Sequence, residues 1–150
     1  MIRSGEQLDL LAWAPPETVV AYDPQLIRAN SYGGRLSRAI SVTLDSCGYT
    51  RAEVAERMSQ HLERKISLNI LNAYASVARD THEISAVRFH ALLAATGDRR
   101  LAEFVVADHG WSVIDRRYLP MIELAAVQEH KRNLSKQERV LRGAVRGGRW

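Results

Sequence analysis

The chain has 150 residues, of which 46% are hydrophobic and 25% charged, an ordinary composition for a folded globular protein. Its net charge of +4 permits an acidic partner without requiring one. The single cysteine, Cys47, excludes an internal disulfide framework and fits a reducing compartment. We find neither a secretion-signal pattern nor an apolar run near the ~20 residues of a membrane span. We therefore expect a soluble, cytoplasmic protein with no membrane contact.

Residues 1–33 differ from the rest because they hold three of the four prolines and no long helical period. This composition predicts an extended arm with turns at Pro15-Pro16 and at Pro24. Gly33-Gly34, where the arm meets the next segment, lacks the lysine and additional glycine of a phosphate-binding loop. We interpret this pair as a hinge.

The arm carries the pentapeptide QLDLL, which resembles the peptide by which bacterial replication proteins dock onto the sliding clamp. Such a peptide buries alternate apolar side chains in a preformed groove, while its glutamine fills a polar pocket. The predicted docking residues are Gln7, Leu8, Leu10 and Leu11. The alternative is that these leucines, with Trp13, form a strap that packs on the helical core or on a second subunit.

Residues 34–114 contain a series of helical patterns with clear start and stop signals. Apolar residues follow helical spacing from Leu36 to Cys47, and Gly48 ends this helix. A capping box of Thr50 with Glu53 opens a second helix, Thr50–Glu63. Three further helices are predicted from their N-cap residues. Ser67 opens a helix over residues 67–79, Ser85 one over 85–97 and Asp98 one over 98–110.

Residues 115–150 predict additional helices followed by a basic tail. Pro120 stands near the first turn of a helix that reaches about His130. Ser135 with Glu138 repeats the capping-box pattern and predicts a short final helix. The predicted fold is therefore all-α, with an extended N-terminal arm (1–33), a five-helix core (34–114) and extra C-terminal helices (115–150).

The five-helix core suggests a helix-turn-helix domain of the lambda-repressor type. In this motif the second helix of a pair enters the major groove of DNA. The pair here is Thr50–Glu63 and Ser67–Arg79, although the join "RKIS" lacks the glycine that is usual in a compact turn. Four polar residues share one face of the second helix and suit base edges, namely Asn69, Asn72, Ser76 and Arg79. The alternative is a core helix with an incidental polar side.

Cations around this helix pair are candidates for holding phosphates. The predicted contacts in the core are the backbone end of the helix at Ser67 and the side chains of Arg35, Arg38, Arg51, Arg57 and Lys65. From Lys131 to Trp150 there are seven Lys and Arg residues against one acid, Glu138. A tail of this kind can follow phosphates without reading sequence, or can be a solvated terminus. Its predicted phosphate contacts are Arg139, Arg142, Arg146 and Arg149.

Several stretches of the chain resemble a known family. They are "QLDLLAW", "AERMSQHL", "LNAYAS" with the following "AR", and "ISAVRFHALLAATG". Over roughly residues 5–114 the chain resembles the small helix-turn-helix proteins encoded in the early regions of transposable, Mu-like phages and their prophages. The resemblance implies a DNA-binding regulator or a replication accessory protein, and it implies no catalytic residues.

The sequence contains no recognisable catalytic or metal-binding pattern. Its five histidines lack the spacing of metal ligands, and one cysteine cannot build a structural zinc site. His82-Glu83 has no third member of a catalytic set, so we interpret it as a surface turn. We expect no enzymatic activity, no cofactor and no metal ion.

These patterns together predict sequence-specific binding of duplex DNA by a phage- or prophage-type transcriptional regulator. A homodimer is expected because one recognition helix rarely supplies enough specificity. Leu119, Ile122 and Ala126 form a candidate interface between subunits. The alternative function is a protein-interaction adaptor of replication or transposition machinery, with QLDLL as its docking peptide.

Overall fold

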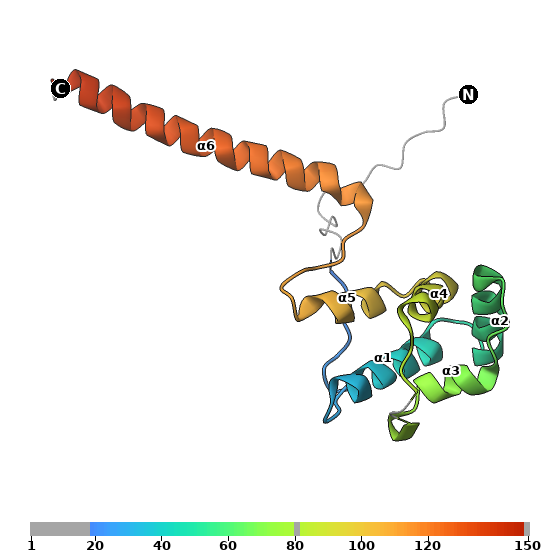
Figure 1. Ribbon diagram of the computed structural model, residues 1–150. Coiled ribbons are helices and arrows are strands. Elements are labelled where there is room, and N and C mark those ends of the chain that lie inside the picture. Colours follow the sequence, from blue (N-terminus) through green and yellow to red (C-terminus); the bar gives the residue numbers. More distant parts are fainter. Residues whose placement is uncertain (1–18, 80–81, 149–150) are drawn as a thin grey trace, which may run out of the picture. The chain divides into compact units, whose positions relative to one another are not determined.

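The computed structural model describes residues 19–79 and 82–148, which are helical and contain no strand (Figure 1). The predicted all-α class is confirmed for these residues. They form two compact units, one ending at Val113 and the other beginning at Ile114. The first unit contains α1 (Tyr32–Ser46), α2 (Arg51–Leu62), α3 (Leu68–Tyr74), the short 3-10 helix η1 (Val77–Arg79), α4 (Ala86–Thr96) and α5 (Arg99–Ala107). The second contains η2 (Arg116–Tyr118) and α6 (Leu119–Arg146).

Side-chain caps determine where the helices of the first unit begin. The Thr50 hydroxyl accepts from the backbone N–H of Glu53 at 3.2 Å, and the Glu53 carboxylate accepts from the Thr50 N–H at 2.7 Å. This is the predicted capping box at the start of α2. Ser67, Ser85 and Asp98 cap α3, α4 and α5, as their positions in the sequence predict.

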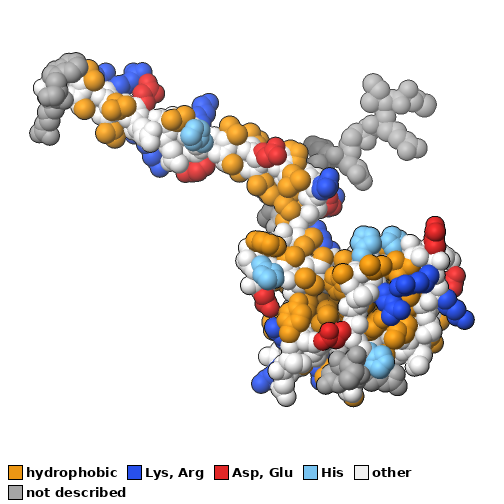
Figure 2. Space-filling model, in the orientation of Figure 1, with side chains coloured by type: hydrophobic (Ala, Val, Ile, Leu, Met, Phe, Trp, Pro, Cys, Tyr) orange, Lys and Arg blue, Asp and Glu red, His pale blue; other side chains and the backbone are white. Residues whose placement is uncertain are grey.

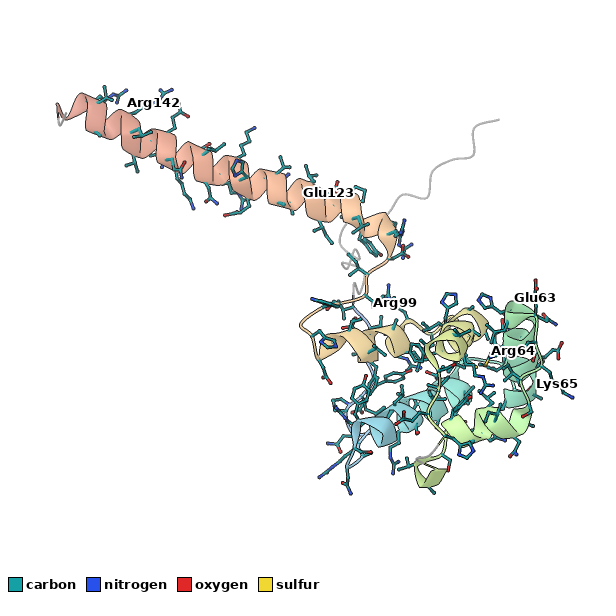
Figure 3. All side chains as sticks on the ribbon, in the orientation of Figure 1. Glu63, Arg64, Lys65, Arg99, Glu123 and Arg142 are labelled. Atoms are coloured by element: carbon teal, nitrogen blue, oxygen red, sulfur yellow. The ribbon has the colours of Figure 1, made fainter. Side chains whose placement is uncertain are left out.

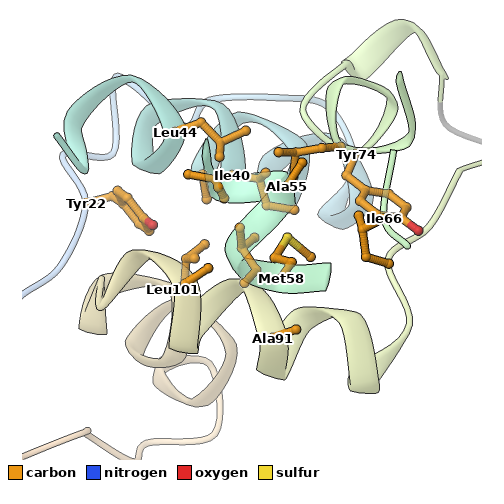
Figure 4. Packing of buried hydrophobic residues seen from close by; sticks show 14 residues of the cluster. Tyr22, Ile40, Leu44, Ala55, Met58, Ile66, Tyr74, Ala91 and Leu101 are labelled. Carbon is orange, nitrogen blue, oxygen red and sulfur yellow. The ribbon is translucent and has the colours of Figure 1, made fainter. Parts of the chain in front are cut away.

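One hydrophobic core holds the first unit together, and each of its five α-helices contributes to it (Figure 4). Helix α2 packs against α3 and α4, while α1 packs against α5 and η1. Met58 of α2 and Leu101 of α5 are fully buried in this core. Because α2 touches both α3 and α4, the position of α3 depends on core packing as well as on its own cap.

Part of the segment predicted as an extended arm belongs to this core. Tyr22 is buried, and its hydroxyl forms a hydrogen bond with the Thr43 hydroxyl of α1. Tyr32 and Gly33 are already helical, because α1 begins at Tyr32 after the N-cap Ser31. Residues 1–18 lie outside the described ranges.

The predicted hinge at Gly33-Gly34 is wrong, because both glycines lie in the first turn of α1. Gly34 is buried, and a Cβ at this position would lie 3.0 Å from the Cβ of Ala29. The same atom would lie 3.5 Å from Cγ1 of Val77 in η1. The contact with Ala29 is tighter than a Cβ normally makes, whereas the one with Val77 is ordinary, so Gly34 is needed for the close approach of the segment before α1.

A polar network joins the segment before α1 to α1 and α5. The Thr43 hydroxyl donates to Oδ2 of Asp98 at 2.7 Å, and Nη2 of Arg100 donates to the same oxygen at 2.7 Å. The Arg100 guanidinium also lies over the ring of Tyr22, 4.7 Å from its centre. Burial raises the pKa of Asp98, but the hydrogen bonds from Arg100 and Thr43 outweigh it and leave the pKa below its ordinary value.

The second unit differs from its prediction, because α6 is one continuous helix of 28 residues rather than two shorter helices. Ser135 lies inside it, and Glu138 pairs forward with Arg142 at 2.5 Å instead of capping a new helix. Glu129 and Arg132 form another pair within the helix at 3.5 Å. A Ser-x-x-Glu pattern opens a helix only where the preceding residues break one, and residues 129–134 contain neither Gly nor Pro.

The network around Asp98 predicts an acid-sensitive stability. Asp98→Asn keeps an N-cap residue but removes the charge, so we expect a loss of about 1–3 kcal/mol of unfolding free energy at pH 7. The folded-state pKa of Asp98 is lowered, so its contribution is complete above the unfolded pKa of about 3.9 and disappears as the pH falls through the folded value. Urea unfolding at pH 7 and at pH 3 measures the difference between variant and wild type. An equal difference at both pH values would contradict this assignment.

Candidate nucleic-acid interface

The link between α2 and α3 replaces the usual glycine with a strained glutamate. Glu63 has a φ of 51° and is the one non-glycine residue with positive φ among the described residues. The backbone N–H of Arg64 donates to the carbonyl of Ser59 at 3.1 Å, and the backbone N–H of Glu63 donates to the carbonyl of Gln60 at 3.3 Å. This pair of bonds is a Schellman motif, which ends α2 and turns the chain toward α3.

Helix α3 is shorter than predicted, and this divides the four proposed base-reading residues. The helix ends at Tyr74, and the chain continues through a turn into η1. Asn69 and Asn72 lie on α3, whereas Ser76 is half-buried between α3 and η1. Arg79 is the last residue of η1, and its side chain lies outside the described part of the structure. The predicted single face across all four residues is therefore wrong.

One side of α3 is anchored in the core and the other is open. Leu71 and Tyr74 are buried, and the Tyr74 hydroxyl forms a hydrogen bond with Arg88 of α4. Leu68 and Asn69 are exposed, and Asn69 makes no hydrogen bond to any described residue. The Ser67 hydroxyl is used in capping, since it accepts from the Ile70 N–H at 3.2 Å. The first turn of α3 thus presents an apolar side chain and an amide to solvent.

The Arg51 guanidinium joins three helices instead of standing free. Its Nη1 donates to Oδ1 of Asn72 at 3.0 Å, which links α2 to α3. Its Nη2 donates to Oδ1 of Asp45 at 3.0 Å and to the Ser41 hydroxyl at 3.4 Å, which links α2 to α1. Arg51 and Asn72 therefore already contact each other in the free protein, and an outside ligand would compete with these bonds.

Two other predicted phosphate contacts also have partners within the unit. Nε of Arg57 donates to the carbonyl of Ala95 at 3.0 Å, near the C-terminal end of α4, and its guanidinium lies 4.2 Å from the centre of the Tyr49 ring. Arg35 forms an ion pair of 3.6 Å with Asp108, just after α5. Both arginines contribute to the packing of helices in this unit.

Besides Arg57, four cations among the described residues of the first unit are exposed and form no ion pair with any described residue: Arg28, Arg38, Arg64 and Lys65. Arg64 and Lys65 belong to the link that leads into α3, on the outer edge of the unit beside α2 (Figure 3). Figure 2 shows Lys and Arg side chains on this edge next to carboxylates. Arg64 belongs to the cations that the sequence places around the helix pair, whereas Leu68 was not among the predicted contacts. A cation that directly follows a helix end, where it has no helical neighbour to pair with, is the signal that identifies Arg64.

The predicted tail contacts lie in the second unit. Arg139, Arg142 and Arg146 are exposed on α6, and Arg142 is the one of these three that pairs with a carboxylate, that of Glu138. Arg149 lies outside the described residues. From Ile114 to Trp150 the sequence has nine Lys and Arg against four Asp and Glu, whereas residues 19–113 have eleven against ten. The excess positive charge is therefore concentrated in the second unit.

No protein-family model, curated protein or solved structure matches this chain. None of the described helices combines the length and the apolar character needed to cross a membrane. The described residues also contain no group of three or more His, Cys, Asp or Glu side chains placed to share a metal ion. The docking residues proposed in QLDLL, Gln7 to Leu11, lie outside the described ranges.

The strain at Glu63 predicts that glycine would stabilise the protein. Glu63→Gly removes a left-handed penalty of about 1–2 kcal/mol, partly offset by the greater freedom of glycine in the unfolded chain, about 0.4–1 kcal/mol. We expect a net gain of about 0.5–1 kcal/mol, measured as a higher Tm. Glu63→Ala is the matched control, since it removes the carboxylate from the end of α2 but keeps the backbone penalty. Equal Tm values for the two variants would contradict the prediction.

The bonds of Arg51 predict a structural effect that is independent of any ligand. Arg51→Met keeps the aliphatic stem but leaves Asn72 and Asp45 without their partner, so we expect a loss of about 1 kcal/mol in chemical unfolding. Arg38→Met removes an exposed cation without an ion pair and should change stability by less than about 0.5 kcal/mol. If both variants unfold like the wild type, Arg51 is free to serve as a phosphate contact.

Proposed function

We propose that the chain binds duplex DNA sequence-specifically, with α2 and α3 acting as a helix-turn-helix pair within a five-helix core of lambda-repressor type. The observation that carries the proposal is the exposure of the first turn of α3. This turn exposes Leu68 and Asn69, directly after two exposed cations without ion pairs, on a helix whose other side is fixed in the core. A helix held in the core, with an exposed amide near exposed positive charge, suits reading of a base edge between phosphates.

The roles of the proposed contacts follow from their surroundings. Asn69 is the principal base-reading residue, because its amide can bond adenine and has no partner among the described residues. Leu68 supplies an apolar contact of the kind that thymine methyl groups accept. Arg64 and Lys65 hold phosphates, and Arg38 is a further candidate. Asn72 is a positioning residue, because its bond to Arg51 fixes α3 relative to α1 and α2.

The balanced charge of residues 19–113 bears on the strength of this binding. With eleven cations against ten acids, this unit supplies little non-specific attraction to a polyanion. The basic C-terminal half of α6, with Arg139, Arg142 and Arg146, supplies the sequence-independent part. In this proposal α3 discriminates between DNA sequences, and α6 adds affinity for any duplex. Regulation of transcription in a phage or prophage remains the biological role that this activity and the sequence resemblance suggest.

The binding test begins with selection of bound duplexes from a random-sequence pool, followed by titration of the selected duplex over a salt series. Asn69→Ala should reduce discrimination against altered sites by about 1–3 kcal/mol while the salt dependence stays nearly unchanged. Arg64→Ala with Lys65→Ala should weaken binding to all sequences and lower the salt slope by about 2.

Matched controls are Asn30→Ala and Arg28→Ala, which remove an exposed amide and an exposed cation from the segment before α1. Neither control should change discrimination between sequences. The proposed function fails if the wild type binds no duplex in a salt-dependent manner. The reading role of α3 fails if Asn69→Ala behaves like Asn30→Ala.

A further inference from the structure

Helix α6 has an apolar stripe that no described residue of the second unit covers. All 28 of its residues are exposed, including Leu124, Leu134 and Leu141, whose exposed fractions are 58%, 51% and 66%. Figure 2 shows hydrophobic side chains along the helix from one end to the other. An isolated helix gains most of its stability from packing of an apolar face, so a stripe of this length calls for a partner.

The stripe follows the alternating three- and four-residue spacing of a helix–helix seam. We name it the α6 seam, and its members are Leu124, Val127, Lys131, Leu134, Glu138, Leu141 and Val145. Five of its seven positions are aliphatic, while the two charged positions carry opposite signs. The face predicted from the sequence, at Leu119, Ile122 and Ala126, lies elsewhere around the helix. Farther along, that face continues through the polar residues His130, Asn133 and Gln137.

We propose that the α6 seam pairs with the α6 seam of a second copy of this chain in antiparallel orientation. When Leu119–Arg146 overlaps in full with the same helix running in reverse, six of the seven seam positions lie opposite one another, and Val145 lies opposite Pro120. Leu124 then faces Leu141 of the second copy, and Lys131 faces Leu134. Lys131 lies in the layer next to Glu138 of the second copy, so opposite charges meet across the seam.

The charges of α6 discriminate between the two possible orientations. In a parallel pair Lys131 would face Lys131 and Glu138 would face Glu138, and like charges at such positions destabilise pairing. A parallel pair would also set the basic C-terminal halves side by side, each with six Lys and Arg between Lys131 and Arg146. The antiparallel pair separates these halves to opposite ends and leaves no two like charges directly facing each other. It places each Lys131 one layer from a Glu138 of the other copy and separates the two Glu138 residues, while the two Lys131 residues lie in adjacent layers.

The length of α6 is sufficient for a stable dimer. At 1.5 Å per residue the helix is about 42 Å long, and the seam spans Leu124 to Val145, or about 32 Å of it. Ten aliphatic side chains from two copies would be buried together in one continuous strip. This proposal does not depend on DNA binding, because it concerns the association of the free protein.

The test of association measures the oligomeric state of the full chain by sedimentation over a concentration series without DNA. The wild type should sediment as a dimer. Leu141→Glu should weaken dimerisation at least tenfold, because it places a carboxylate opposite Leu124 of the second copy, in an apolar layer of the seam. Val140→Glu is the matched control, since Val140 is exposed on α6 outside the seam and its change should leave the dimer intact. A wild type that is monomeric at all concentrations, or equal effects of the two variants, would overturn the proposal.

Orientation is tested by exchanging the two seam charges. Lys131→Glu and Glu138→Lys should each weaken the dimer, and the double exchange should restore it, because the pair across the seam is re-formed in reverse. Parallel copies would keep their like-charge contacts in the double variant and show no such recovery. Circular dichroism checks that α6 remains helical in each variant, because Glu138→Lys also loses its pair with Arg142.

A distance measurement decides the orientation independently. Nitroxide labels on single cysteines in a Cys47→Ser chain report the spacing between copies, and Gly143 accepts a side chain because a Cβ there meets nothing within 4 Å. In the antiparallel pair, labels at Asn133 lie close together, whereas labels at Gly143 are about 32 Å apart along the axis. Short distances at both positions would show a parallel pair and contradict the proposal. Failure of DNA binding with the dimer intact would instead count against the proposed function alone.

Discussion

The position of α3 depends on the hydrogen bonds that the Arg51 guanidinium makes. This guanidinium sits in the first turn of α2 and bonds to Asn72 of α3 and to Asp45 of α1, so it fixes the three helices relative to one another at their polar edge. The hydrophobic core alone would leave a seven-residue helix such as α3 poorly constrained, since helices this short are marginal without tertiary contacts. The exposed first turn of α3 is therefore held by polar bonds on one side and by Leu71 and Tyr74 on the other.

The same contact explains why a residue can suit DNA in the sequence and still be occupied in the structure. Arginine and asparagine are frequent readers of DNA, and the positions of Arg51 and Asn72 on neighbouring helices fit that use. Their side chains, however, reach each other across 21 residues of sequence, and no local pattern reveals such a pair. Arg57 and Arg35 likewise have partners that are distant in the sequence, Ala95 and Asp108.

Local signals determined most of what could be predicted about the fold. The N-cap residues Thr50, Ser67 and Ser85 act on N–H groups within a few residues of themselves, so their roles can be read from the sequence directly. The end of α3 could not be read in this way. The chain leaves the helix after Tyr74, and η1 then packs against α1 near Gly34, which depends on residues about 40 positions earlier. The pattern of Ser135 with Glu138 predicts a new helix, but no residue before it breaks the preceding one, so α6 continues through it.

The two units differ in charge, since the first is nearly neutral and the second is basic. If the first unit reads DNA as proposed, its nearly neutral charge gives it little long-range attraction to a duplex, because reading base edges contributes little to such attraction. The basic face of α6 consists of Arg132, Lys136, Arg139, Arg142 and Arg146. It lies about 110° around the helix from the α6 seam, at 3.6 residues per turn. The two-fold axis of an antiparallel pair runs perpendicular to both helices, so the basic faces of the two copies point to the same side. A parallel pair, whose axis runs along the helices, would direct them to opposite sides. Antiparallel pairing therefore gives one cationic surface, with positive charge at both ends, that can follow a single duplex.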